Sequence, residues 1–171
     1  MRSQRFRDST GVVNRRSSNS KRPLALIGHS RGGALARAIA GGLQNRVSHL
    51  ILLGSPVGEL QLAVTNGQPI NLANAGVNRT VEEASMFARR LLDPNCSFPR
   101  CGCAFAKDIA RLLSELTAVL SVFSPDDQIV SPAACRVMDG KNLEISGTHS
   151  GLVYNREVYR EVARFLAESP R

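Results

Sequence analysis

Apolar residues are grouped along the chain in two distinct patterns. Continuous apolar runs of strand length occupy Leu24 to Ile27, Leu50 to Leu53 and Thr117 to Phe123. Helical spacing of apolar residues is found over Ala34 to Leu43, Ala104 to Leu116 and Arg156 to Glu168. We therefore predict strands over the first set of segments and helices over the second.

Two of these helices have an apolar face that we expect to be buried. In the helix over 104–116 that face consists of Phe105, Ile109, Leu112, Leu113 and Leu116. In the last helix, which Asn155 is expected to cap, it consists of Val158, Val162, Phe165 and Leu166. A further helix is predicted from Thr80 to Leu92, because Thr80 to Glu83 form a capping box and Asp93-Pro94 stops it.

The first 22 residues differ in composition from the rest of the chain. They carry seven Arg and Lys residues against a single Asp, and their one apolar pair is Val12-Val13. Most of the net charge of +8 therefore lies in this tail and does not make the domain a nucleic-acid binder. We predict a basic, disordered tail over 1–22 and a single domain over 23–171.

The apolar runs of the sequence do not match a targeting signal. No apolar run reaches membrane-spanning length, and no apolar core of a signal peptide follows the charges of the tail. We therefore expect no integral membrane segment and a cytoplasmic location by default.

The candidate nucleophile is Ser30. It stands in Gly28-His29-Ser30-Arg31-Gly32, between the apolar run that begins at Leu24 and an alanine-rich helical stretch. A serine on such a strand-to-helix turn is a nucleophile elbow, in which Gly28 and Gly32 would let helix and strand pack closely. A bare GxSxG motif also occurs by chance, so the flanking strand and helix carry the prediction.

A serine nucleophile needs a base, and the chain has only three histidines. His29 lies inside the elbow and His49 begins an apolar run, so we interpret both as structural. His149 lies in a loop of small residues, between the apolar stretch Leu143 to Ile145 and the last helix. It is the candidate base, with an ordinary loop histidine as the alternative.

The orienting acid is expected between the serine and the histidine in the chain. Asp126 and Asp127 follow the predicted strand that ends at Phe123. Turn chemistry after Pro125 would also explain an Asp pair. We favour Asp127 for catalysis and Asp126 for the turn.

Taken together, GHSRGG around Ser30, the loop from Asp127 to Val130 and GTHSGL around His149 resemble the α/β-hydrolase superfamily, and in particular its bacterial lipase-like and esterase-like members. The segment HLILLGSP from His49 to Pro56 adds to the likeness. The resemblance implies a mostly parallel sheet flanked by helices, with a helical cap-like insertion over 57–116. It also implies hydrolysis of carboxylic or lipid esters without a cofactor or metal.

The same resemblance assigns the backbone N–H of Arg31 as the first oxyanion donor. The second donor would come from a loop after an earlier strand, which the 22 residues before Pro23 do not supply. The chain thus resembles the C-terminal part of a hydrolase. The strand from Leu24 would then be an edge strand, which favours self-association or a partner chain.

The four cysteines leave the redox state open. Cys96, Cys101 and Cys103 have poor spacing for zinc. A disulfide between Cys135 and Cys101 or Cys103 would tie the insertion to the acid loop and would indicate an exported protein. Reduced thiols would instead be small buried apolar groups.

Two functions therefore stand side by side. The first is a serine esterase that uses Ser30, Asp127 and His149, with acyl transfer as a variant of the same chemistry. The second is a catalytically silent fragment or interaction module that retains the elbow.

Overall fold

A four-stranded parallel sheet forms the centre of the protein. The computed structural model describes residues 22–58 and 104–168. The strands are β1 (Leu24–His29), β2 (Val47–Leu53), β3 (Ala118–Phe123) and β4 (Lys141–Glu144), and they lie side by side in chain order. The predicted strands and the expected parallel sheet are thus confirmed. In the sheet that the described residues form, β1 is an edge strand, and its Ile27 is 56% exposed.

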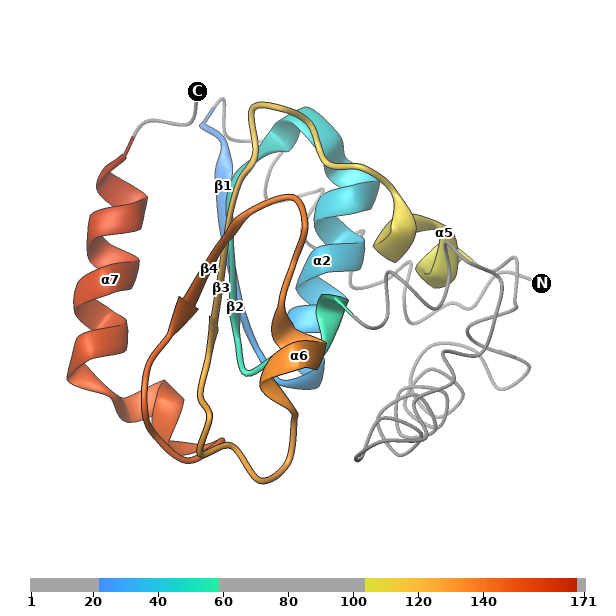
Figure 1. Ribbon diagram of the computed structural model, residues 1–171. Helices are drawn as coiled ribbons and strands as arrows, with labels where there is room; N and C mark the ends of the chain where they lie inside the picture. Colours follow the sequence, from blue (N-terminus) through green and yellow to red (C-terminus); the bar gives the residue numbers. More distant parts are fainter. Residues whose placement is uncertain (1–21, 59–103, 169–171) are drawn as a thin grey trace.

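Helices cover both faces of this sheet (Figure 1). On one side lie α2 (Arg31–Leu43), the short α6 (Pro132–Cys135) and, beyond α2, α5 (Ala104–Ala110). On the other side lies α7 (Arg156–Ala167). Two 3-10 turns, η1 (Gln44–Arg46) and η3 (Gly151–Tyr154), lead into β2 and α7.

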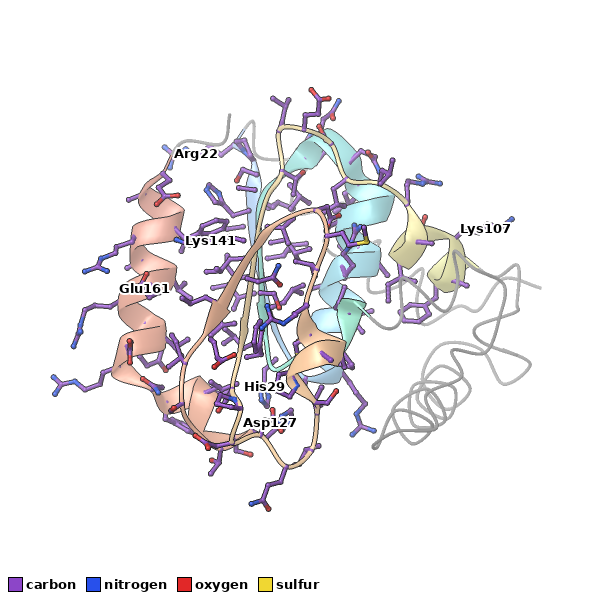
Figure 2. The ribbon with its side chains drawn as sticks, in the orientation of Figure 1. Arg22, His29, Lys107, Asp127, Lys141 and Glu161 are labelled. Atoms are coloured by element: carbon purple, nitrogen blue, oxygen red, sulfur yellow. The ribbon has the colours of Figure 1, made fainter. Side chains whose placement is uncertain are left out.

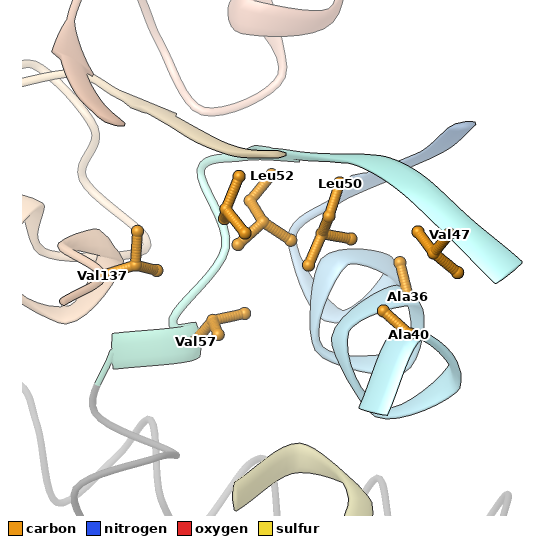
Figure 3. Close-up of a cluster of buried hydrophobic side chains, with 8 residues drawn as sticks. Ala36, Ala40, Val47, Leu50, Leu52, Val57 and Val137 are labelled. Atoms are coloured by element: carbon orange, nitrogen blue, oxygen red, sulfur yellow. The ribbon is translucent and has the colours of Figure 1, made fainter. Parts of the chain in front are cut away.

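The core between α2 and the sheet depends on small helical residues (Figure 3). Ala36 and Ala40 face the larger side chains of β2, so the helix can lie close to the strand. The buried members of this cluster are Ala36, Ala40, Val47, Leu50, Leu52, Val57, Val119 and Val137.

The opposite core is closed by α7. The Asn155 side chain accepts hydrogen bonds from the backbone N–H groups of Glu157 and Val158, which confirms it as the N-cap. Val158 and Phe165 are buried against the sheet, and Val162 is partly buried. The prediction that Leu166 would be buried is wrong, since it is 38% exposed at the last turn of the helix.

The helix predicted over 104–116 ends earlier than its apolar pattern indicates. Phe105 and Ile109 are buried as expected, but α5 stops at Ala110. The carbonyl of Arg111 accepts a hydrogen bond from Arg37, and that of Leu112 accepts one from Gln44. Side chains from the region of α2 therefore bind carbonyls that a longer helix would use itself. Leu112 is 80% exposed and Leu116 is 54% exposed as a result.

A buried ion pair fastens α2 to the segment before β4. Arg37 is fully buried, and its Nη2 lies 2.9 Å from Oδ2 of Asp139. Burial lowers the pKa of the Arg37 guanidinium, and the attraction of Asp139 opposes that shift. The pair joins the α2 layer to the loop that leads toward the strand preceding His149.

Several predictions fall outside the described residues. They include most of the basic tail, the greater part of the cap-like insertion, the helix from Thr80 to Leu92, and Cys96, Cys101 and Cys103. Cys135 is buried beside Phe123, Val130 and Ala134, and its predicted disulfide stays a prediction. Within 22–58 and 104–168, no helix is long and apolar enough to cross a membrane.

Candidate active site

Ser30 has a strained backbone between β1 and α2. Its φ is 54° and its ψ is −127°, a combination that residues other than glycine rarely adopt. Hydrogen bonds fix this turn, because the backbone N–H of Ser30 donates to the carbonyl of Leu53 at 2.9 Å. The N–H of Gly33 donates to the carbonyl of Ser30 at 3.0 Å. The predicted sharp turn with serine at its tip is present.

Close packing at this turn depends on Gly28 and Gly33 rather than on Gly28 and Gly32. A Cβ on Gly28 would stand 2.5 Å from the Cα of Gly33. A Cβ on Gly33 would stand 2.0 Å from Oγ of Ser55, which is buried after β2. Apart from its chain neighbours and the backbone of its own helix, no atom of the described residues lies within 4 Å of the corresponding position on Gly32. The packing role expected for Gly32 therefore belongs to Gly33.

Asp127 lies in the loop that leaves the carboxyl end of β3. Its Oδ1 accepts hydrogen bonds from the backbone N–H groups of Ile129 at 2.8 Å and Val130 at 2.9 Å. The carboxyl group is therefore oriented by the loop that follows it. Asp126 is exposed, and its backbone N–H donates to Oγ of Ser124 within the turn.

The second carboxylate oxygen of Asp127 meets His149. Oδ2 of Asp127 lies 2.6 Å from Nδ1 of His149, and the two side chains are 1% and 8% exposed. A short hydrogen bond that is removed from water is the arrangement that orients an imidazole. The structure thus brings Asp127, and not Asp126, to the candidate base.

Ser124 joins the two loops that carry this pair. Its fully buried Oγ accepts hydrogen bonds from the backbone N–H groups of Asp126 at 3.0 Å and Gly147 at 2.9 Å. Asp126 precedes Asp127, and Gly147 lies two residues before His149. One hydroxyl therefore sets the spacing between the acid loop and the base loop.

Backbone hydrogen bonds connect these loops to the strand ends. The N–H of Gly54, which follows β2, donates to the carbonyl of Val122 at 2.8 Å, and the N–H of Ile145 donates to that of Phe123 at 2.9 Å. Together with the bond from Ser30 to Leu53, they place the ends of all four strands along one sheet edge. That edge is where ligands bind in parallel α/β proteins.

Gly54 lies directly against the Asp127–His149 hydrogen bond. Its φ is +52°, and a Cβ there would stand 3.2 Å from Oδ2 of Asp127 and 3.3 Å from Nδ1 of His149. A side chain at this position would press on the hydrogen-bonded atoms themselves.

His29, which the sequence analysis interprets as a structural residue, lies next to the site. Its Nε2 lies 3.0 Å from the carbonyl oxygen of His149, and the two rings have centroids 4.6 Å apart. Figure 2 shows His29 and Asp127 in the same region at the end of the sheet. The register of β1 could have indicated this position. His29 pairs with Leu53, and Leu53 faces α7 and the base loop.

His49, by contrast, has the structural position expected of it. It is buried near the start of β2, its Nε2 lies 3.1 Å from the carbonyl of Glu168, and its ring packs edge-on against Phe165. Arg31 is the first residue of α2, so its backbone N–H lies at the positive end of the helix. Among the described residues, no group of three His, Cys, Asp or Glu side chains could hold a metal ion.

The fold is shared with solved structures of low sequence identity. One is a monoacylglycerol lipase from Paleococcus ferrophilus, with a TM-score of 0.53 and 12% identity over 95% of this chain and 75% of the lipase. Another is a lipase-esterase related protein from Clostridium acetobutylicum, with a TM-score of 0.51 and 18% identity over 94% of this chain and 75% of that one.

A third similar structure is MGS-MChE2, described as an α/β hydrolase from a lagoon-sediment metagenome. Its TM-score is 0.54, with 14% identity over 93% of this chain and 68% of that one. No protein-family model matches the sequence, and a search of curated proteins gives no match. The evidence for kinship is therefore the arrangement of the backbone.

Proposed function

Because the chain has the α/β-hydrolase fold, we propose that it is a serine hydrolase of carboxylic esters, with Ser30 as nucleophile, His149 as base and Asp127 as orienting acid. The observation that carries the proposal is the buried hydrogen bond of 2.6 Å between Asp127 and His149. It lies at the sheet edge where Ser30 has its strained backbone. A strained serine turn beside a buried carboxylate–imidazole pair is the arrangement that serine hydrolases use for acyl transfer.

The proton arrangement follows from the hydrogen bond. A carboxylate oxygen only accepts, so Nδ1 of His149 carries the proton that it donates to Asp127. In the neutral ring Nε2 is then unprotonated and can take a proton. After His149 accepts the proton of Ser30, the Asp127 carboxylate stabilises the imidazolium.

Atoms balance over a two-step cycle. Ser30 Oγ attacks the ester carbonyl, its proton moves to Nε2 of His149, and the same proton leaves with the alcohol as the acyl-enzyme forms. A water then attacks the acyl-enzyme, gives its proton to His149, and the carboxylic acid and the free serine are released. If an alcohol replaces water in the second step, the product is a new ester.

The start of α2 is proposed to stabilise the negative charge that develops on the carbonyl oxygen of the substrate. The backbone N–H of Arg31 is the proposed first donor, and the positive end of the 13-residue helix adds to its effect. Support for an ester substrate comes from the names of the similar structures, among them a monoacylglycerol lipase and a lipase-esterase related protein.

The proposal is tested by labelling the folded full-length chain with a fluorophosphonate probe and locating the adduct by peptide mass spectrometry. We expect an adduct on Ser30 that is lost in Ser30→Ala and strongly reduced in His149→Ala. Hydrolysis of p-nitrophenyl acetate should fall in parallel. Ser150→Ala is the matched control. Ser150 is an exposed serine next to His149, and the Ser150 side chain makes no helix-capping hydrogen bond.

Two results would contradict the proposal. One is a folded wild-type chain that neither reacts with the probe nor hydrolyses the ester, which would favour a catalytically silent interaction module. The exposed Ile27 on the edge strand β1 would then be the first place to look for a partner. The other is an adduct on a serine other than Ser30.

A further inference from the structure

His29 connects the nucleophile turn to the main chain of the candidate base. It is the last residue of β1, directly before Ser30, and its ring is half-buried. Its Nε2 lies 3.0 Å from the carbonyl oxygen of His149, which is 120 residues further along the chain. This side-chain hydrogen bond joins the elbow to the base loop.

The partner atom fixes the protonation of His29. A carbonyl oxygen has no proton to donate, so the contact requires His29 to carry a proton on Nε2. In its neutral form His29 is therefore the Nε2–H tautomer. His149 has the opposite requirement, because its Nδ1 must donate to Asp127.

The two histidines also touch through their rings. The centroids are 4.6 Å apart and the planes are tilted by 44°. Asp127 holds one edge of the His149 ring, while His29 holds its backbone carbonyl and contacts its ring. Rotation of the imidazole would break its hydrogen bond to Asp127 and its ring contact with His29.

From these contacts we infer that His29 is a positioning residue, whose Nε2–H holds the His149 backbone so that its imidazole stays aligned with Ser30. This role rests on the proposed function, since alignment matters only if His149 takes the proton of Ser30. His29 itself transfers no proton in the reaction. Its effect is geometric, and misplacement of a catalytic group by about 1 Å can cost about 100-fold in rate.

The first test is independent of activity. Two-bond ¹H–¹⁵N correlation spectra of the histidine-labelled full chain distinguish the Nε2–H from the Nδ1–H tautomer. His29→Gln identifies the signals of His29 by their loss. We expect neutral His29 as the Nε2–H tautomer, and the Nδ1–H tautomer would overturn the inference without any variant having to be active.

The second test separates the donor from the ring volume. His29→Phe keeps an aromatic ring but no donor, whereas His29→Gln keeps a terminal N–H group. For p-nitrophenyl acetate we expect kcat to fall about 10- to 100-fold in His29→Phe with KM little changed. His29→Gln should retain a clearly higher kcat than His29→Phe.

His49→Phe is the matched control. It removes another histidine Nε2 contact to a main-chain carbonyl, that of Glu168 at 3.1 Å, but near the start of β2. We expect His49→Phe to lower the unfolding temperature and leave kcat unchanged. Equal kcat values for His29→Phe and His49→Phe in an active protein would overturn the positioning role.

Failure of the proposed function would look different. In that case the wild type would neither label at Ser30 nor hydrolyse ester, yet the tautomer of His29 could still be read. Solvent exchange of the His149 Nδ1 proton should also be faster in His29→Phe than in wild type. An unchanged exchange rate would overturn the inference even in an inactive protein.

Discussion

Oδ2 of Asp127 lies 2.6 Å from Nδ1 of His149, and the neighbouring Asp126 turns away into solvent. Two adjacent carboxylates thus have separate tasks. Asp127 has both oxygens engaged, one by backbone N–H groups and one by the imidazole. Asp126 contributes its backbone N–H to the turn, where it donates to Oγ of Ser124.

Asparagine substitutions at the two positions should therefore differ sharply. Asp127→Asn replaces the accepting oxygen and favours the wrong tautomer of His149, so kcat for p-nitrophenyl acetate should fall by about 10³- to 10⁴-fold. Asp126→Asn should leave kcat within about threefold of wild type, as expected for an exposed position. The order of the two values is the result to check, and a larger loss in Asp126→Asn would refute the assignment.

Alanine substitutions at Gly32 and Gly33 form a matched pair on one helical turn. A methyl group on Gly33 would stand 2.0 Å from Oγ of Ser55, so we expect Gly33→Ala to lower the free energy of unfolding by about 1–3 kcal/mol. The methyl group in Gly32→Ala would meet no described residue outside its own helical turn within 4 Å, so this variant should be neutral or slightly stabilising. Urea unfolding followed by circular dichroism measures both, and equal stabilities would contradict the assigned contact.

Gly54→Ala should lower both the stability and the kcat of the protein. The loss of kcat should exceed what unfolding of part of the sample would cause. The left-handed backbone at φ +52° costs a residue with a side chain about 1–2 kcal/mol. The new methyl group would also press on Oδ2 of Asp127 and Nδ1 of His149. We expect a lower kcat in a protein that is still folded at the assay temperature. Wild-type kcat in Gly54→Ala would mean that the pair tolerates displacement.

Asp108 gives a prediction about pH. Burial raises the pKa of its carboxyl, while Arg111 and Lys107 oppose that shift. The folded state then binds the proton more tightly than the unfolded state, so this group's contribution to stability falls as pH rises from the unfolded pKa through the folded one. Asp108→Asn should therefore raise the Tm relative to wild type at pH 7.

The same substitution should bring little gain below the ordinary Asp pKa of about 3.9, where the carboxyl is protonated in both states. The Tm difference between Asp108→Asn and wild type, measured by scanning calorimetry across this range, is the quantity to compare. A variant that is less stable than wild type at pH 7 would show that attraction to Arg111, at 3.6 Å, outweighs burial.

Local sequence patterns predicted three of the four strands, the serine turn and the loops that carry Asp127 and His149. Each depends on neighbouring residues, such as the apolar run before Ser30 or the small residues around His149. Asn155 is a similar case, since a cap bonds to N–H groups two and three residues away.

What the sequence did not predict depends on contacts between distant segments. The end of α5 is set by Arg37 and Gln44, which lie 74 and 68 residues from the carbonyls that they bind. The close approach at Gly33 depends on Ser55, and the role of His29 depends on His149. Apolar periodicity carries no information about such partners.

The register of the strands fixes the positions of the site residues at the strand ends. His29 is aligned with Leu53, Leu53 with Val122, and Val122 with Leu143. A deletion of one residue within β2 would pull Gly54 back by about 3.3 Å and turn its neighbours to the opposite face. We therefore expect an insertion or deletion within a strand to disrupt the site. The connections between the strands can vary in length without this effect.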